Sequence, residues 1–188
     1  MTEEYDETQG WQGLWTVDRE HSKAEFAVRY LIPETTGVFG EVAGRLNFDE
    51  ENPEKSLVET TIQVSSIDTG HQKRDEDLLE REDFFQAERF PEITFQSTQV
   101  EASGSDRMKV YGDLTIRGVT KEVMLDVQYK DHNIDAYGTH RAIFEAETEL
   151  SREEFGVDWG GTLGRLVIGD EVTVKLYLEA VREGFSPE

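Results

Sequence analysis

Apolar and polar residues alternate along most of the chain, and this period of two restricts the fold more than any other feature. In the last such segment, Val172, Val174, Leu176 and Leu178 alternate with polar or charged residues. A strand with one apolar face and one polar face is half-buried, which is typical of antiparallel sheets. Comparable segments occur at 24–30, 38–48, 58–64, 93–100, 110–116, 123–129, 142–150 and 172–180. The pattern therefore predicts about eight long antiparallel strands.

One segment interrupts the alternation. Between Lys73 and Glu88 the apolar residues are scattered among charges, which predicts a short helix followed by a turn. A second local signal is Ser151-Arg152-Glu153-Glu154, a capping box that predicts a short helical turn. The string Gly160-Gly161-Thr162-Leu163-Gly164 lacks the Lys-Ser/Thr ending of a phosphate loop, so we interpret it as a flexible loop.

Long alternating strands with little helix favour an up-and-down barrel or a sandwich. Closure into a barrel removes the exposed strand edges that otherwise promote aggregation. An eight-stranded barrel has room inside for side chains or for one small ligand. Gly40, Gly44 and Gly112 occupy inward positions of the alternation, where a glycine marks a bend or space left for another group.

Composition narrows the functional classes. The 188 residues suffice for one domain, which we assign to 14–182, between an acidic tail at 1–13 and a short tail at 183–188. The chain has no cysteine, which excludes disulfides and thiolate chemistry. Its net charge of −22 disfavours nucleic acid as a partner. An acidic surface of this kind suits a protein of concentrated salt, and ordinary solubility is the alternative explanation that composition leaves open.

No apolar run is long enough to span a bilayer, and the first residues do not form a secretory signal. We therefore expect a cytoplasmic protein that does not span a membrane. A periplasmic or secreted location is the alternative, if a leader has been removed.

Motifs for catalysis are sparse. The histidines His21, His71, His132 and His140 have no metal-binding spacing, and no Gly-x-Ser-x-Gly elbow is present. His21 is expected to form a hydrogen bond at the start of a strand. We predict no catalytic residue, metal or cofactor.

A set of motifs in fixed order resembles a known family. These are Val17-Asp18-x-x-His21-Ser22, Gly37-x-Phe39-Gly40-x-Val42-x-Gly44, Arg74-Asp75-x-x-Leu78, Phe90-Pro91-x-Ile93-Thr94-Phe95, Gly112-x-Leu114-Thr115-Ile116-Arg117-Gly118-Val119-Thr120-Lys121 and Leu150-x-Arg152-x-x-Phe155-Gly156-Val157. Together they resemble the YceI-like family from about Trp15 to Ala180. The sequence departs from the family at Tyr30 and Asp77, where members often have histidine, so the headgroup preference of relatives does not transfer directly.

The resemblance implies an all-β fold, an antiparallel eight-stranded lipocalin-like barrel with a short helical insertion. It also implies non-enzymatic binding, transport or storage of an isoprenoid lipid or isoprenoid quinone, with a possible homodimer as its assembly. From this we predict a tunnel lined by strand residues Phe26, Val28, Tyr30, Phe39, Val42, Ile62, Leu114 and Phe144. The insertion and loops are expected to add Leu78, Phe84, Phe85, Phe95, Phe155 and Trp159. Arg74 and Asp75 are the headgroup candidates, or else an ion pair that fixes the insertion to the barrel.

Two other classes of function stay open at this point. An isomerase or hydratase using the barrel as a reaction chamber would require a desolvated group such as Tyr30 or Asp83 facing the cavity. A structural or interaction module would instead have an interior filled by its own side chains.

Overall fold

The computed structural model describes residues 13–30, 33–49, 52–158 and 167–182. Within these ranges the strands are β1 (Gly13–Val17), β2 (Lys23–Tyr30), β3 (Glu34–Phe39), β4 (Val42–Phe48), β5 (Leu57–Gln63), β6 (Ile67–Asp68), β7 (Glu92–Ala102), β8 (Arg107–Ile116), β9 (Val119–Ile134), β10 (His140–Ser151) and β11 (Ile168–Arg182). The helices are α1 (Gln72–Glu80) and three short 3-10 turns, Pro53–Lys55, Val64–Ser66 and Glu153–Phe155. Both tails assigned from the sequence, the glycine-rich string and Trp159 lie outside the described residues, apart from Gly13.

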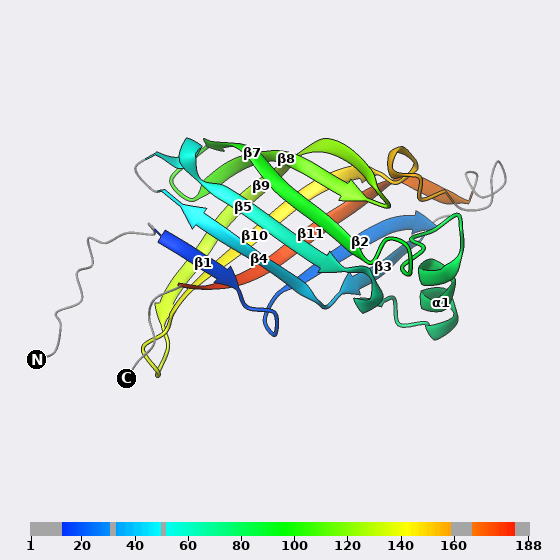
Figure 1. Cartoon of the computed structure of the whole chain (residues 1–188), viewed down its shortest axis with the longest axis horizontal. Coiled ribbons are helices and arrows are strands. Elements are labelled where there is room, and N and C mark those ends of the chain that lie inside the picture. Colours follow the sequence, from blue (N-terminus) through cyan, green and yellow to red (C-terminus); the bar gives the residue numbers. More distant parts are fainter. Residues whose placement is uncertain (1–12, 31–32, 50–51, 159–166, 183–188) are drawn as a thin grey trace, which may run out of the picture.

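The strands close into a barrel (Figure 1). Each strand pairs antiparallel with its neighbour in the order β1-β4-β5-β7-β8-β9-β10-β11. The ring closes because β1 pairs with β4 on one side, with Trp15 opposite Leu46, and with β11 on the other, with Trp15 opposite Arg182. The prediction of an eight-stranded antiparallel barrel is therefore confirmed for the described part of the chain.

Three of the eight strand positions are broken, which is why more strands are present than the alternation predicts. β2, β3 and β6 continue β1, β4 and β5 beyond short interruptions. Ser66 joins two of these interruptions, because its hydroxyl donates to the Gln63 carbonyl at 2.7 Å and accepts from the Glu41 amide at 3.1 Å. Strand β11 bridges the third, since its last residues pair with β1 and its earlier residues with β2.

The helical insertion predicted at 73–88 consists of α1 and the turns that follow it, and it covers one end of the barrel (Figure 1). His71 caps α1, its Nδ1 accepting from the Arg74 amide at 3.3 Å. After the helix the chain folds back, so that the Phe85 amide donates to the Leu78 carbonyl at 3.0 Å. β6 pairs with β3, whereas β7 pairs with β5 and β8, so the insertion connects two strands that are not neighbours in the sheet.

The opposite end of the barrel is filled. Its core contains Trp15, Val17, Leu46, Ala142, Phe144, Leu178 and Ala180, all buried. In β10 the buried residues are His140, Ala142, Phe144 and Ala146, as the period of two predicts. At the predicted capping box the Glu154 amide donates to the Ser151 hydroxyl at 3.3 Å, one of the two hydrogen bonds of that motif, and the short turn at Glu153–Phe155 follows Arg152 as its N-cap.

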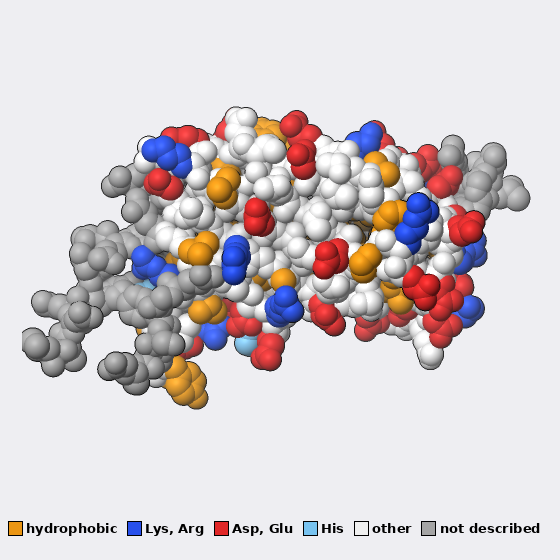
Figure 2. Space-filling model, viewed as in Figure 1, with side chains coloured by type: hydrophobic (Ala, Val, Ile, Leu, Met, Phe, Trp, Pro, Cys, Tyr) orange, Lys and Arg blue, Asp and Glu red, His pale blue; other side chains and the backbone are white. Residues whose placement is uncertain are grey.

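Charged groups cover the outer wall. On the face shown in Figure 2, carboxylates are spread over the barrel and single apolar side chains lie apart from one another. Several lysines have acidic partners across or along strands, including Lys23 with Glu25 at 2.6 Å and Lys130 with Glu145 at 3.2 Å. None of the helices in the described ranges has the length and apolarity needed to cross a bilayer.

Candidate ligand-binding cavity

A cavity of about 540 Å³ occupies the barrel beneath α1. Its volume falls within the ~300–1,000 Å³ of sites that bind small organic ligands. The wall is mostly apolar, and α1 contributes three of its charged side chains, Lys73, Arg74 and Asp77. The interior is thus hollow at one end and filled at the other.

Most of the residues predicted to line a tunnel do line this cavity. They are Phe26, Val28, Tyr30, Phe39, Ile62, Leu78, Phe84, Phe85, Phe95, Leu114 and Phe155, together with Arg74 at the mouth. Aromatic contacts hold part of the wall, with the Phe26 and Phe39 rings 5.5 Å apart between centroids.

The remaining predicted residues lie elsewhere. Val42 is fully buried in the core at the start of β4 and does not reach the cavity. Phe144 lies nearer the filled end and lines a second, smaller cavity. The period of two places both side chains inside the barrel but does not define their height along its axis. Trp159 lies outside the described residues.

Arg74 and Asp75 do not pair with each other, and both bind Thr69. The Arg74 guanidinium donates from Nε to the Thr69 hydroxyl at 2.7 Å and from Nη2 to its carbonyl at 2.6 Å. The Asp75 carboxylate accepts from the Thr69 amide at 3.0 Å and from its hydroxyl. The pair therefore fixes the start of α1 to the end of β6, and only Arg74 also faces the cavity.

Sequence reasoning missed the part of the cavity wall formed by β8–β11. It consists of inward residues of β8–β11, namely Ile116, Val123, Leu125, Thr148, Leu150, Ile168, Val172, Val174 and Leu176. The alternation had marked most of them as inward, but nothing in the sequence distinguished the wall of a cavity from filled core.

Arg152 was also missed as a site residue. It is 8% exposed, and its guanidinium donates to the carbonyls of Val157 at 2.8 Å, Gly169 at 2.9 Å and Ile168 at 3.2 Å. These carbonyls lie on the two sides of residues 159–166, so Arg152 ties the end of β10 to the start of β11 beside the cavity. The sequence did offer one signal for Arg152, because it belongs to the motif Leu150-x-Arg152-x-x-Phe155-Gly156-Val157.

The cations around the mouth already have partners. Lys73 Nζ lies 2.9 Å from an oxygen of Asp77, and this hydrogen bond raises the pKa of Lys73. Arg74 is bound by Thr69, as described above. Of these two α1 cations, Lys73 is therefore paired with a carboxylate, whereas Arg74 is held by neutral acceptors and keeps its positive charge at the cavity.

The candidate groups for catalysis are separated. Tyr30 lines the cavity and is 40% exposed. Asp83 does not line it and instead accepts two hydrogen bonds from Arg81, at 2.9 and 2.8 Å. Of the two groups named as candidates for a reaction chamber, Tyr30 thus lines the cavity and Asp83 does not.

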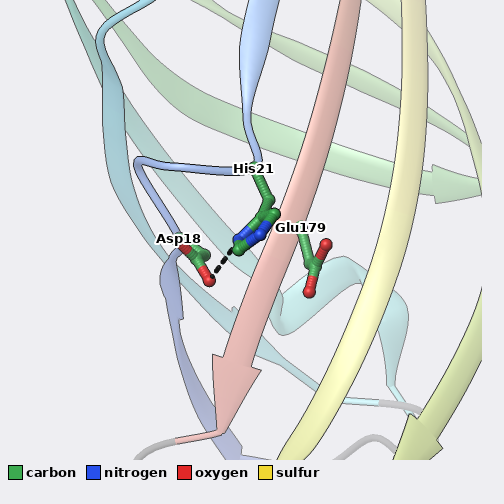
Figure 3. Close-up of side chains that lie close together, drawn as sticks. All are labelled: Asp18, His21 and Glu179. Carbon is green, nitrogen blue, oxygen red and sulfur yellow. Dashed lines mark hydrogen bonds and ion pairs between the residues drawn. The ribbon is translucent and has the colours of Figure 1, made fainter.

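Asp18, His21 and Glu179 approach one another at the filled end of the barrel (Figure 3). His21 Nδ1 lies 2.9 Å from Asp18 Oδ2, the hydrogen bond expected of it, and this contact raises the pKa of His21. Arg141 Nη1 lies between the two carboxylates, 2.7 Å from Asp18 and 2.6 Å from Glu179. A guanidinium thus takes the position that a bound cation would need, and the cluster is an ion-pair network joining β10, β11 and the β1–β2 connection.

Comparison with known proteins identifies the family. A model of the YceI-like domain matches residues 15–180. The chain belongs to the YceI-like family. This confirms the resemblance seen in the motifs. The YceI-like chain is 37% identical over 165 residues to UPF0312 protein plu2095 of Photorhabdus laumondii, covering 87% of this chain and 83% of that protein. It is 36% identical over 146 residues to Protein YceI of Salmonella arizonae, covering 76% and 75%.

Several solved structures have the same barrel fold as this chain. The YceI-like barrel superposes on BcnA of Burkholderia cenocepacia with a TM-score of 0.78 and 25% identity, covering 87% of this chain and 98% of BcnA. The Campylobacter jejuni YCEI protein gives 0.71 and 26%, covering 81% and 87%. A polyisoprenoid binding domain from Saccharophagus degradans gives 0.67 and 19%, covering 89% and 98%, which is a likeness of fold alone.

Proposed function

We propose that this protein binds one isoprenoid lipid or isoprenoid quinone non-covalently, for transport or storage, with the apolar tail inside the barrel. The observation that carries the proposal is the apolar cavity of about 540 Å³ beneath α1. A module with a filled interior would not contain such a space. The YceI-like family membership is consistent with a lipid-binding barrel.

The cavity volume sets the length of tail that it can hold. A cavity of ~150 Å³ accommodates benzene, which corresponds to roughly 25 Å³ per carbon. On that scale the cavity holds about 20 carbons, or about four isoprene units. At ~0.3 kcal/mol per buried heavy atom this gives about 6 kcal/mol, a dissociation constant on the order of tens of micromolar before the headgroup contributes.

The mouth favours an uncharged headgroup. The Lys73 ammonium is paired with Asp77, the Arg74 guanidinium is held in place by Thr69, Glu25 lines the same cavity, and the chain carries a net charge of −22. The negative electrostatic potential of the chain would repel a phosphate headgroup, whereas it would not repel an uncharged quinone or alcohol. We therefore favour a quinone or a polyprenol over a polyprenyl phosphate.

Identification of the natural ligand tests the proposal. The protein is purified from its native host, extracted with organic solvent, and the extract is analysed by mass spectrometry. We expect an isoprenoid in stoichiometric amount. A protein that yields no lipid and, once stripped, takes up neither polyprenols nor isoprenoid quinones while keeping its β-sheet circular dichroism would contradict the proposal.

An enzyme is the other candidate function, and Tyr30 is the cavity residue that would take part in the reaction. Exchange of Tyr30 for phenylalanine keeps the apolar ring at the mouth but removes the hydroxyl. We expect ligand uptake to change less than twofold, because burial rather than the hydroxyl drives it. Turnover of the bound isoprenoid by the wild-type protein that Tyr30→Phe abolishes would favour the enzyme.

A further inference from the structure

A thin layer of side chains separates the main cavity from a second one of about 50 Å³ in the filled half of the barrel. The second cavity is lined by core residues such as Trp15, Val100 and Phe144. Four residues line both cavities: Thr60, Phe95, Leu125 and Leu176. They come from β5, β7, β9 and β11, which are spread around the ring, so together they cross the barrel.

Phe95 is the largest member of this layer, and the barrel leaves room for its ring. Phe95 is 6% exposed and lies opposite Thr60 on β5 and Leu114 on β8. A Cβ atom at Gly112 would lie 2.5 Å from the Phe95 Cζ atom, so the ring occupies the space that a side chain at position 112 would take. Gly112, which the sequence marked as either a bend or space left for another group, thus allows the ring to extend into the barrel.

We infer that Phe95 is the floor of the ligand cavity and sets the tail length that the protein accommodates best. The inference rests on the proposed function. A tail enters beside α1, because the other end of the barrel is filled, and its terminal methyl groups reach the layer formed by Phe95, Leu125 and Leu176. Isoprene units beyond that length stay outside the mouth and add no buried surface.

Removal of the Phe95 ring joins the two cavities. The ring contributes the volume of six carbons and the second cavity, at roughly 25 Å³ per carbon, about two more. Phe95→Ala is therefore expected to extend the optimal tail by one to two isoprene units.

The test measures binding of a series of polyprenols of increasing length to delipidated full-length protein by native mass spectrometry. The readout is the length at which affinity stops rising. The variants are Phe95→Ala and, as a matched control, Val100→Ala, which truncates a buried residue of the same strand that lines only the smaller cavity. We expect the limit to move by one to two units in Phe95→Ala and to stay unchanged in Val100→Ala.

Two further variants show whether a changed length limit in Phe95→Ala reflects the cavity or a folding defect. Phe95→Leu keeps an apolar side chain and is expected to move the limit by no more than one unit. The double variant Phe95→Ala, Ala146→Leu refills the joined space from β10, because Ala146 lines the second cavity, and is expected to restore the wild-type limit.

The possible failures are distinct. In one outcome, folded Phe95 variants bind short polyprenols, and their affinity stops rising at the same tail length as in the wild type. That result would contradict the role of Phe95 as the floor but not the proposed function. Absence of polyprenol binding in every variant, including the wild type, would overturn both.

Discussion

The rings of Phe39 and Phe85 meet edge to face, with centroids 5.8 Å apart and planes at 85°. Phe39 belongs to β3 in the barrel wall, and Phe85 to the turn after α1. Both line the main cavity, so this contact joins the helical insertion to the wall at the mouth. An aromatic pair of this geometry is worth roughly 1 kcal/mol beyond the area that it buries.

Phe85→Ala is expected to loosen the insertion. The dissociation rate of a bound polyprenol should rise about fivefold, because that factor corresponds to a loss of about 1 kcal/mol. Stopped-flow displacement by a competing lipid measures the rate. Phe90→Ala is the control, since Phe90 lies in the same segment but does not line the cavity; an equal acceleration in this control would contradict the role assigned to Phe85.

Val174→Trp is expected to block the cavity. Val174 faces the cavity from β11, opposite Phe26 on β2 and Thr148 on β10, so a large ring there occupies space that the ligand needs. Polyprenol affinity should fall at least tenfold, while the free energy of unfolding changes by about 1 kcal/mol or less, because the ring enters a void rather than packed core. Lys175→Trp, one residue along on a position about half exposed, should bind normally. Wild-type affinity in Val174→Trp would show that the ligand lies elsewhere.

Arg152→Ala is expected to destabilise the barrel by about 3 kcal/mol, because it leaves buried carbonyls without donors. The midpoint of urea unfolding measures the loss. Arg152→Lys should be intermediate, since an ammonium cannot reproduce the planar set of donors. Arg107→Ala, which removes an exposed cation 3.5 Å from Asp126, should cost less than about 0.5 kcal/mol. A cost for Arg152→Ala as small as that of the control would contradict the bonding described.

The network around Arg141 predicts opposite pH dependences for two of its members. Burial alone raises the pKa of Asp18, but hydrogen bonds from Arg141 and His21 outweigh it and leave that pKa below its ordinary value of 3.8. Asp18 therefore stabilises the fold above that value, and its contribution disappears as the pH falls through the lowered folded pKa. The raised pKa of His21 means that its contribution is complete below its ordinary value of 6.5 and is lost as the pH rises through the folded pKa.

Urea unfolding of wild type, Asp18→Asn and His21→Ala across pH checks these signs. The difference between wild type and Asp18→Asn should shrink at the acid end, and that for His21→Ala should shrink above pH 6.5. Differences that stay constant with pH would show that neither group gains its partner on folding.

Salt is expected to stabilise the protein. A net charge of −22 places like charges close together over the outer wall (Figure 2), and molar salt shortens the screening length to ~3 Å. The melting temperature should therefore rise from low to molar sodium chloride. A flat or falling melting temperature would contradict adaptation to concentrated salt.

Some of this structure could be predicted from the sequence, and the missed parts have physical reasons. Alternation is a local property, so it located the long strands and their inward faces, but it missed the short strands β1 and β6 and the break between β3 and β4. The break at Val64–Ser66 depends on the Ser66 hydroxyl reaching Glu41, a partner distant in the chain. Phe95 lines the main cavity, whereas Phe144 lines only the smaller one. This difference depends on strand tilt and register, which the alternation of apolar and polar residues does not specify.

The motif residues show the same limit. Arg74 and Asp75 lie at the insertion as predicted, but their common partner Thr69 could not be identified, because a sequence motif does not show which hydrogen bonds its side chains form. Val42 shows that an inward apolar side chain next to a break packs into the core instead of facing a ligand.

Strand β11 runs from the hollow half of the barrel to the filled half, pairing with β2 in the first and with β1 in the second. Its amide protons should therefore exchange with solvent at unequal rates, slowly beside Trp15 and faster beside the cavity, because local opening costs less where fewer side chains are packed. We therefore expect the filled half to stay folded while the hollow half opens locally. A ligand bound in the cavity could then dissociate without global unfolding.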